Sequence, residues 1–234
     1  PKAAAIALLR GGARVLMDEE EIIQAAYDWC TNLGGPAALV AGAVVATIYE
    51  TMNSGNLDLK KGDEGTVKIM KKATRLLLLS AFALEVFSIF VTTVTGTVLL
   101  AKTYDIPEAK HYSAISFLRE NFEFEYLTAR LTFLQGLLNW LAAIGLNHAI
   151  PQGETGTTRK INKLVAYSLC CTGIVMISFW NNHLTHYRNY GAMWLRWFVV
   201  TWTKFVWKWP PQPLTVVLVP SLFMALKMAY EAFT

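Results

Sequence analysis

The chain has 234 residues, of which 54% are hydrophobic and 16% are charged. Soluble domains are less apolar and carry more charge, so this composition indicates an integral membrane protein with little room for a separate soluble domain. The net charge of +4 gives no reason to expect a nucleic-acid partner, and three cysteines without a CxxC pair argue against a disulfide framework.

Residues 1–33 are predicted to form an N-terminal arm and an interfacial helix. The arm, over residues 1–16, is basic and rich in alanine and leucine. Acidic residues suit the start of a helix, so the run from Asp18 to Glu21 predicts a helix that begins there and continues with a broad apolar face. Such an amphipathic helix fits the membrane interface. The sequence Asn-Leu-Gly-Gly-Pro at 32–36 is expected to break it.

The first span is predicted from Pro36 to Met52, within a four-span bundle over residues 34–182. It contains three small residues spaced four apart, which are Ala38, Gly42 and Ala46. Small residues at this spacing let two helices approach closely inside a membrane. We therefore expect this face to pack on another helix of the chain or, as the alternative, on a partner subunit.

The longest apolar stretch lies between Arg75 and Lys102, where 26 residues include a single ionisable side chain, that of Glu85. As a helix these residues measure about 39 Å, more than the roughly 30 Å of bilayer hydrocarbon. The stretch therefore predicts a second span that crosses the membrane with tilt. Its second half is rich in threonine, whose hydroxyl groups can bond to a neighbouring helix, so the span is expected in the middle of the bundle.

A third span is predicted from Tyr126 to Ile150, antiparallel to the second. Gln135 and Asn139 lie four residues apart and so share a helix face, and a rough antiparallel alignment places Glu85 level with Asn139. These three residues are predicted to form an intramembrane polar network. Three roles compete for Glu85: a polar pin between helices, a ligand to a metal or to the magnesium of a chlorophyll, and a residue on a proton or ion path.

The fourth span is predicted over residues 164–180. His183 and His186 follow its end, whereas His148 ends the third span on the opposite side of the membrane, so the three cannot form one site. Each is a candidate axial ligand of a pigment or haem; an interfacial histidine with a hydrogen-bonded ring is the alternative. Glu85 and these histidines are the candidate cofactor-binding residues. No metal site is predicted, because no third ligand is apparent.

A tryptophan-rich segment lies within residues 183–213. Five of the eight tryptophans occur here, interleaved with basic residues: Trp194, Trp197, Trp202, Trp207 and Trp209. Because tryptophan and flanking cations prefer the headgroup level, these tryptophans are predicted to be interfacial anchors on a helix at the membrane surface. The apolar tail over residues 214–234 is either a fifth, kinked span or a second interfacial helix.

Together these elements predict an all-α integral membrane protein, a bundle of four or five transmembrane helices with amphipathic interfacial helices at the N-terminus and after span four. No nucleotide-binding, hydrolase or zinc-protease motif occurs, so we do not expect an enzyme. The first function hypothesis is a non-catalytic accessory or structural subunit of a large energy-transducing membrane complex, in contact with the lipid bilayer and with other membrane subunits.

Two host membranes are considered for such a subunit. Candidate magnesium ligands and many aromatic residues slightly favour the thylakoid, with a pigment-binding role in a photosystem-antenna assembly and chlorophyll or carotenoid as the cofactor. The alternative is an accessory subunit of a respiratory complex in the inner mitochondrial membrane. By the positive-inside tendency, the basic loops at 53–74 and 151–163 are expected to face the stroma, matrix or cytoplasm.

The second function hypothesis is a homo-oligomeric cation channel or small transporter. Four spans, of which the first ends in a glutamate (Glu50, in the stretch ALVAGAVVATIYE), are loosely similar to the layout of Orai-type calcium channels. The resemblance implies a ring of such glutamates that selects cations. It covers the layout and that one stretch only, and the segment before the first span is acidic here but basic in that family.

Overall fold

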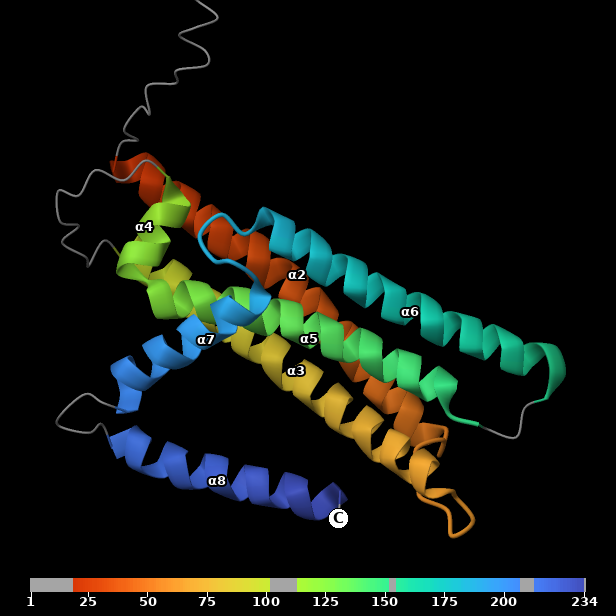
Figure 1. Cartoon of the computed structure of the whole chain (residues 1–234). Coiled ribbons are helices and arrows are strands. Elements are labelled where there is room, and N and C mark those ends of the chain that lie inside the picture. Colours follow the sequence, from red (N-terminus) through yellow and green to blue (C-terminus); the bar gives the residue numbers. More distant parts are fainter. Residues whose placement is uncertain (1–18, 102–112, 152–154, 207–212, 234) are drawn as a thin grey trace, which may run out of the picture.

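The computed structural model of the chain describes residues 19–101, 113–151, 155–206 and 213–233. Within these ranges every regular element is helical (Figure 1): α2 (Glu19–Asn53), α3 (Gly65–Leu100), α4 (Ala114–Asn121), α5 (Glu123–Ala149), α6 (Gly156–His183), α7 (Tyr190–Thr201), the π-helical turn η1 (Trp202–Val206) and α8 (Pro213–Phe233). The predicted all-α fold is confirmed for this part of the chain.

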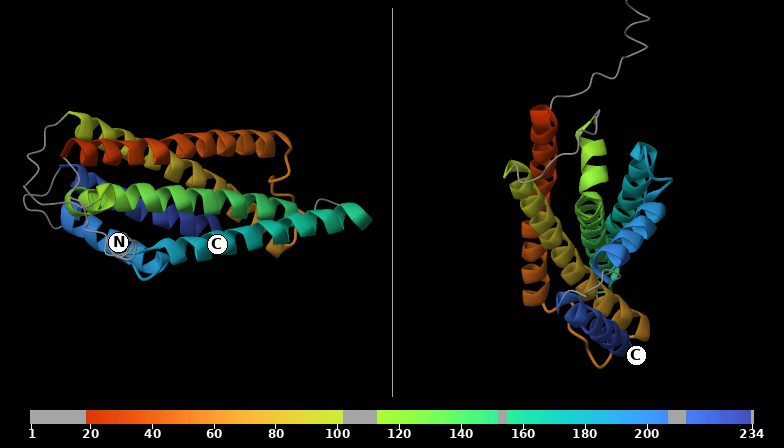
Figure 2. Two further views of the ribbon diagram at one scale, coloured as in Figure 1. Left: turned by 90° about the horizontal axis from the view of Figure 1, so that it is seen from above. Right: turned by 90° about the vertical axis from the view of Figure 1, so that its left-hand side faces the viewer.

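Four helices, α2, α3, α5 and α6, are long and apolar enough to cross a membrane. Consecutive members of this set run in opposite directions, so α2 and α5 begin at the end of the bundle where α3 and α6 finish (Figures 1 and 2). The prediction of an integral membrane protein with at least four spans is therefore confirmed among the described residues.

The C-terminal helix α8 lies at the edge of the bundle beside α3 (Figure 2). It continues through Pro220, and its side chains over residues 219–228 are exposed. Exposed apolar side chains fit both lipid contact across the membrane and contact with its surface. The choice between a fifth span and a second interfacial helix stays a prediction.

The predicted break at residues 32–36 is wrong, because α2 runs through it without interruption. Gly34 lies against α3: a Cβ atom added there would be 2.7 Å from the Thr92 hydroxyl oxygen, so glycine permits close approach of the two helices. Pro36 is exposed and removes only its own N–H donor, which membrane helices tolerate. The predicted boundary between an interfacial helix and the bundle therefore falls inside one long helix.

Helix α3 occupies the centre of the bundle, with α2 on one side and α5 on the other. Its buried face includes polar residues along most of its length, among them Thr74, Glu85, Ser88, Thr92 and Thr95. Helix α6, by contrast, packs mainly along α5 and has no buried residue. The core is thus a three-helix unit, α2–α3–α5, with α6 attached to its outside.

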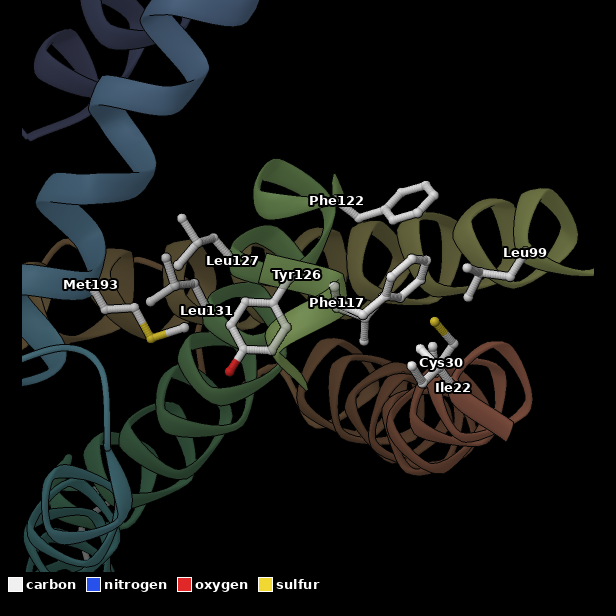
Figure 3. Close-up of a cluster of buried hydrophobic side chains, with 11 residues drawn as sticks. Ile22, Cys30, Leu99, Phe117, Phe122, Tyr126, Leu127, Leu131 and Met193 are labelled. Carbon is white, nitrogen blue, oxygen red and sulfur yellow. The ribbon is translucent and has the colours of Figure 1, made fainter. Parts of the chain in front are cut away.

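The tryptophan-rich segment folds back onto the bundle. Figure 3 shows the apolar cluster in which Met193 of α7, fully buried, meets Leu127 and Leu131 of α5. Trp197 packs against the same cluster, and its indole Nε1 donates a hydrogen bond to the Thr128 hydroxyl at 2.8 Å. Much of this segment is therefore held by protein.

The tryptophans differ in how far they pack on the bundle, and their role as headgroup anchors stays a prediction. Trp194 and Trp197 are half-buried against the bundle, because α7 turns an apolar stripe toward α5. Trp202 is 56% exposed, as expected for an anchor. Trp207 and Trp209 lie outside the described residues.

A buried lysine fixes the turn between α2 and α3. The Lys71 ammonium is 6% exposed and donates hydrogen bonds to the Asp63 carboxylate at 2.7 Å and to the Asp58 carbonyl at 2.8 Å. Arg75 pairs with the Asp58 carboxylate at 2.8 Å. The Lys71 hydrogen bond, with one from the Lys60 backbone N–H, holds the pKa of Asp63 below its ordinary value of about 3.8.

We expect the order of this turn to depend on pH. A carboxyl group whose folded-state pKa is lowered stabilises the fold above its unfolded value, near 3.8 here, and loses that contribution as the pH falls through the lower folded value. Amide hydrogen-exchange protection over residues 54–64 should therefore be constant above about pH 5 and fall below about pH 4. In Lys71→Met this acid dependence should become weaker, because only the hydrogen bond from the Lys60 N–H to Asp63 remains; an unchanged pH profile in that variant would contradict the assignment.

Candidate functional site at Glu85

The carboxyl group of Glu85 lies in the centre of the bundle, where α3 faces α5. The residue is fully buried, and neither carboxyl oxygen has a hydrogen-bond partner within the described part of the chain. Opposite it stands Gly136, where an added Cβ atom would lie 2.6 Å from Glu85 Oε1 and 3.0 Å from its Cδ. Glycine at 136 therefore provides the space that the carboxyl group occupies.

The predicted hydrogen bond between Glu85 and Asn139 is not formed. Asn139 donates through Nδ2 to the Ser80 hydroxyl at 3.0 Å and accepts from Gln135 Nε2 at 2.7 Å. The alignment of α3 and α5 differs from the rough estimate by about one helical turn, because Glu85 stands opposite Gly136. Gln135 and Asn139 do share a helix face and bond to each other, as predicted.

Sequence reasoning missed two members of the network, Ser80 and Tyr190. The Tyr190 hydroxyl donates to Gln135 Oε1 at 3.1 Å, and its backbone N–H donates to the Asn181 side chain at 2.7 Å. The chain is therefore Tyr190–Gln135–Asn139–Ser80, and it excludes Glu85. A tyrosine at the start of α7, 55 residues from Gln135 in sequence, gives no local signal of this contact.

Two hollows flank Glu85 along α3. The first, of about 230 Å³, lies between α2, α3 and α5 near the α2–α3 turn and is lined by polar groups that include Glu50, Thr74, Asn147 and His148. We call it the loop-end hollow. The second, of about 310 Å³ between α2 and α3, is lined by Tyr27, Cys30, Gly34, Thr92 and Thr93 among others, and we call it the threonine hollow.

Glu85 lies between these hollows along α3. The nearest α3 residue that lines the loop-end hollow is Leu78, seven residues or about 10 Å away, and the nearest that lines the threonine hollow is Ile89, four residues or about 6 Å away. Between Glu85 and Thr92, the Ser88 hydroxyl donates to the Ala129 carbonyl at 3.2 Å. A buried carboxyl group without a hydrogen-bond partner among the described residues is costly, so its position between the two hollows makes it the candidate functional group.

The histidines lie apart from Glu85. His148 lines the loop-end hollow, whereas His183 and His186 are exposed at the opposite end of the bundle, as predicted. His183 Nδ1 lies 2.8 Å from the Phe179 carbonyl oxygen, and the two rings are 4.1 Å apart. This is the hydrogen-bonded interfacial ring given as the alternative. No cluster of three or more metal-ligating side chains occurs among the described residues, and pigment ligation stays a prediction.

The stripe of small residues on α2 faces away from the other helices that the structure describes. Ala38, Gly42 and Ala46 are exposed, and an added Cβ atom at Gly42 would meet nothing within 4 Å. Contacts within the chain use a different face, which carries Ala37, Ala41 and Val44. Of the two predictions for this stripe, packing on another helix is not found within the described part of the chain, and packing on a partner stays a prediction.

Comparison of the chain with protein-family models, with curated proteins and with solved structures finds no significant match. Its function must therefore be argued from the fold and from these sites.

Proposed function

We propose that the chain is a non-catalytic structural subunit of a larger membrane assembly, with α2 as its docking helix. The exposed stripe Ala38, Gly42 and Ala46 carries this proposal. Small residues four apart allow a second helix to approach the backbone closely, and van der Waals packing is a main source of helix association in lipid. A helix that faced lipid alone would gain nothing from small side chains there.

The outer helices support the same proposal. No residue of α6 is buried, and the side chains of α8 over residues 219–228 are exposed. Large apolar side chains such as Phe179, Phe223 and Leu226 are each more than 60% exposed on them. Such faces fit contact with lipid and with neighbouring subunits.

We further propose an energy-transducing complex as the host, in the thylakoid ahead of the inner mitochondrial membrane. The abundance of aromatic residues, together with His148, His183 and His186 as candidate axial ligands, supports bound chlorophyll or carotenoid. Glu85 is fully buried against Gly136 and is the weakest of the candidate ligands. A tagged chain isolated in mild detergent should then carry pigment absorption. A colourless preparation in which respiratory subunits co-purify would contradict the thylakoid host and support the mitochondrial one.

The Gly42→Leu variant tests the docking helix. It adds bulk where the chain itself leaves open space, so the fold should be kept, while association should weaken at least tenfold, roughly 1.4 kcal/mol. By native electrophoresis or mass photometry, the natural chain should run in a particle several times its own 26.1 kDa, and the variant should not. The matched control is Cys171→Leu, which enlarges an exposed position of α6. Equal effects of the two substitutions would contradict a specific α2 interface.

Proton or cation passage is the second candidate function, favoured by one observation. Glu85 is fully buried, has no hydrogen-bond partner among the described residues, and lies along α3 between the loop-end hollow and the threonine hollow. A carboxyl group so placed could exchange protons or cations with both sides. Flux into liposomes that contain the chain alone, and its loss in Glu85→Gln, would support this candidate over the structural one.

A further inference from the structure

A long groove runs between α5 and α6. Its volume is about 760 Å³, and its walls are mostly apolar, with Leu138, Ala142 and Leu146 on α5 facing Leu169, Gly173 and Ile177 on α6. Small residues on both helices, such as Gly145 and Ala166, keep the two backbones close while the groove stays open beside them. None of the described residues that line it is acidic.

One end of the groove is basic. Arg159 and Lys163 line it there, four residues apart on one face of α6 and within its first two turns. The Arg159 guanidinium donates one hydrogen bond, to the Ile150 carbonyl at 3.2 Å, which leaves most of its donors available. Lys163 has no hydrogen-bond or ion-pair partner among the residues that the structure describes. Both cations therefore stand at one membrane surface, where the groove opens.

At the opposite end of the groove, the polar side chains already bond to one another. This end is lined by Gln135, Asn139 and Tyr190, whose side chains bond to one another and to Ser80. From Lys163 to Ile177 the groove follows 14 residues of α6, about 21 Å, which exceeds the roughly 15 Å of one leaflet's hydrocarbon. The groove thus combines a cationic mouth at the surface with an apolar channel below it.

The chemistry of the lining indicates the occupant of the groove. Its mouth carries Arg159 and Lys163, and the rest of its length is mostly apolar. This pattern matches a molecule with one anionic group and a long hydrocarbon chain, as the anionic phospholipids of a bilayer have.

We propose that this groove binds one anionic phospholipid, with its phosphate held by Arg159 and Lys163 and an acyl chain between α5 and α6. Basic pockets between membrane helices suit anionic headgroups, because each cation near the surface adds electrostatic attraction. The N-terminal end of α6 adds the positive end of its helix dipole. The lipid would fill the open side of the α5–α6 contact and so hold α6, which has no buried residue of its own, onto the bundle.

The test is lipid retention by the purified full chain in native mass spectrometry, with phosphatidylglycerol and phosphatidylcholine as probes. Phosphatidylglycerol should bind more tightly than phosphatidylcholine. Lys163→Gln should weaken phosphatidylglycerol binding about fivefold, and the double variant Arg159→Gln/Lys163→Gln should weaken it about 25-fold. The matched control is Lys160→Gln, one turn away on α6 and outside the groove, which should change binding less than twofold. Equal losses in Lys160→Gln and Lys163→Gln, or equal binding of the two lipids, would overturn the site.

A second variant tests the acyl half of the proposal. Ala142→Phe leaves all charges in place and fills the channel from an exposed position, so phosphatidylglycerol retention should fall at least tenfold while the helical circular-dichroism signal is kept. Inorganic phosphate at millimolar concentration should not displace the lipid. Full retention in Ala142→Phe, or displacement by phosphate, would reduce the site to a surface anion contact and overturn the groove as a lipid site.

Discussion

The Glu85→Lys variant is expected to lose the folded bundle, whereas Glu85→Met is expected to be more stable than the natural chain. Lysine would place an ammonium group in a fully buried position that offers no ion-pair partner among the described residues to the carboxyl group now there, at a cost of about 3–5 kcal/mol for an uncompensated buried charge. Methionine has a similar length and no group that needs a hydrogen bond. It therefore removes the cost of burying an unsatisfied carboxyl group, which is about 1–3 kcal/mol. Unfolding in mixed detergent micelles, followed by circular dichroism, measures both.

Gly136 provides the control for this prediction. Gly136→Ala should cost about 1–3 kcal/mol in the natural chain, because its Cβ atom would press on the Glu85 carboxyl group at 2.6 Å. In a Glu85→Ala background that cost should largely vanish, which gives a coupling of about 1 kcal/mol or more in a double-mutant cycle. Gly42→Ala, which meets nothing within 4 Å, should be close to neutral in either background.

The opposite outcome for Glu85→Met is equally informative. Lower stability than the natural chain would mean that the carboxyl group has a partner in the folded protein, such as a bound cation or a ligand. Higher stability with loss of liposome flux would mean that the chain carries a costly group because its function needs it. Higher stability with an intact assembly would leave Glu85 as a polar pin and favour the structural proposal.

Hydropathy was sufficient to predict the bundle, because a span is a local property of about 20 residues. The position of α3 at its centre also followed from sequence, since one buried carboxyl group and a run of threonines need protein around them. The pairing partner of Glu85 did not follow. A shift of one helical turn between α3 and α5 moves Asn139 from Glu85 to Ser80, and hydropathy is insensitive to such a shift.

The continuity of α2 through Gly34 and Pro36, where the sequence predicts a break, has a physical cause. A glycine close to Thr92 and a proline on an exposed face are compatible with a membrane helix. The burial of Lys71 also does not follow from the basic sequence of the loop at 53–74, because its ammonium donates hydrogen bonds to Asp58 and Asp63 of the turn. The first result depends on contacts between helices and the second on how the turn folds, and neither is contained in the sequence of one helix.

The docking of α7 was missed although a local signal was present. Asn189 caps the helix by accepting a hydrogen bond from the Ala192 N–H at 2.8 Å, and Met193, Trp197 and Val200 then recur at helical spacing on one face. That pattern predicts a helix with one face against protein. The tryptophan-rich composition is equally typical of an interfacial helix, so composition alone does not distinguish the two arrangements.

The Met193→Ala variant should therefore detach α7 without unfolding the bundle. Met193 is fully buried at the contact of α7 with α5, so truncation should cost about 2–4 kcal/mol. Helix α7 contacts mainly α5 and α6 and is not one of the three core helices α2, α3 and α5. The loss of its docking should therefore leave those helices folded. Hydrogen-exchange protection over residues 190–201 should fall, while protection over residues 78–95 of α3 should not.

The control for α7 is Leu195→Ala, two residues further along the helix and 69% exposed, which should change protection by less than about 0.5 kcal/mol. Arg196 pairs with Glu123 in a two-point contact at 2.7 and 2.8 Å, but both side chains are partly exposed. Such pairs contribute about 0.2–1 kcal/mol, so this one cannot hold α7 once Met193 is truncated. If Glu123→Gln released α7 as fully as Met193→Ala does, the ion pair and not the apolar contact would be what fixes this helix.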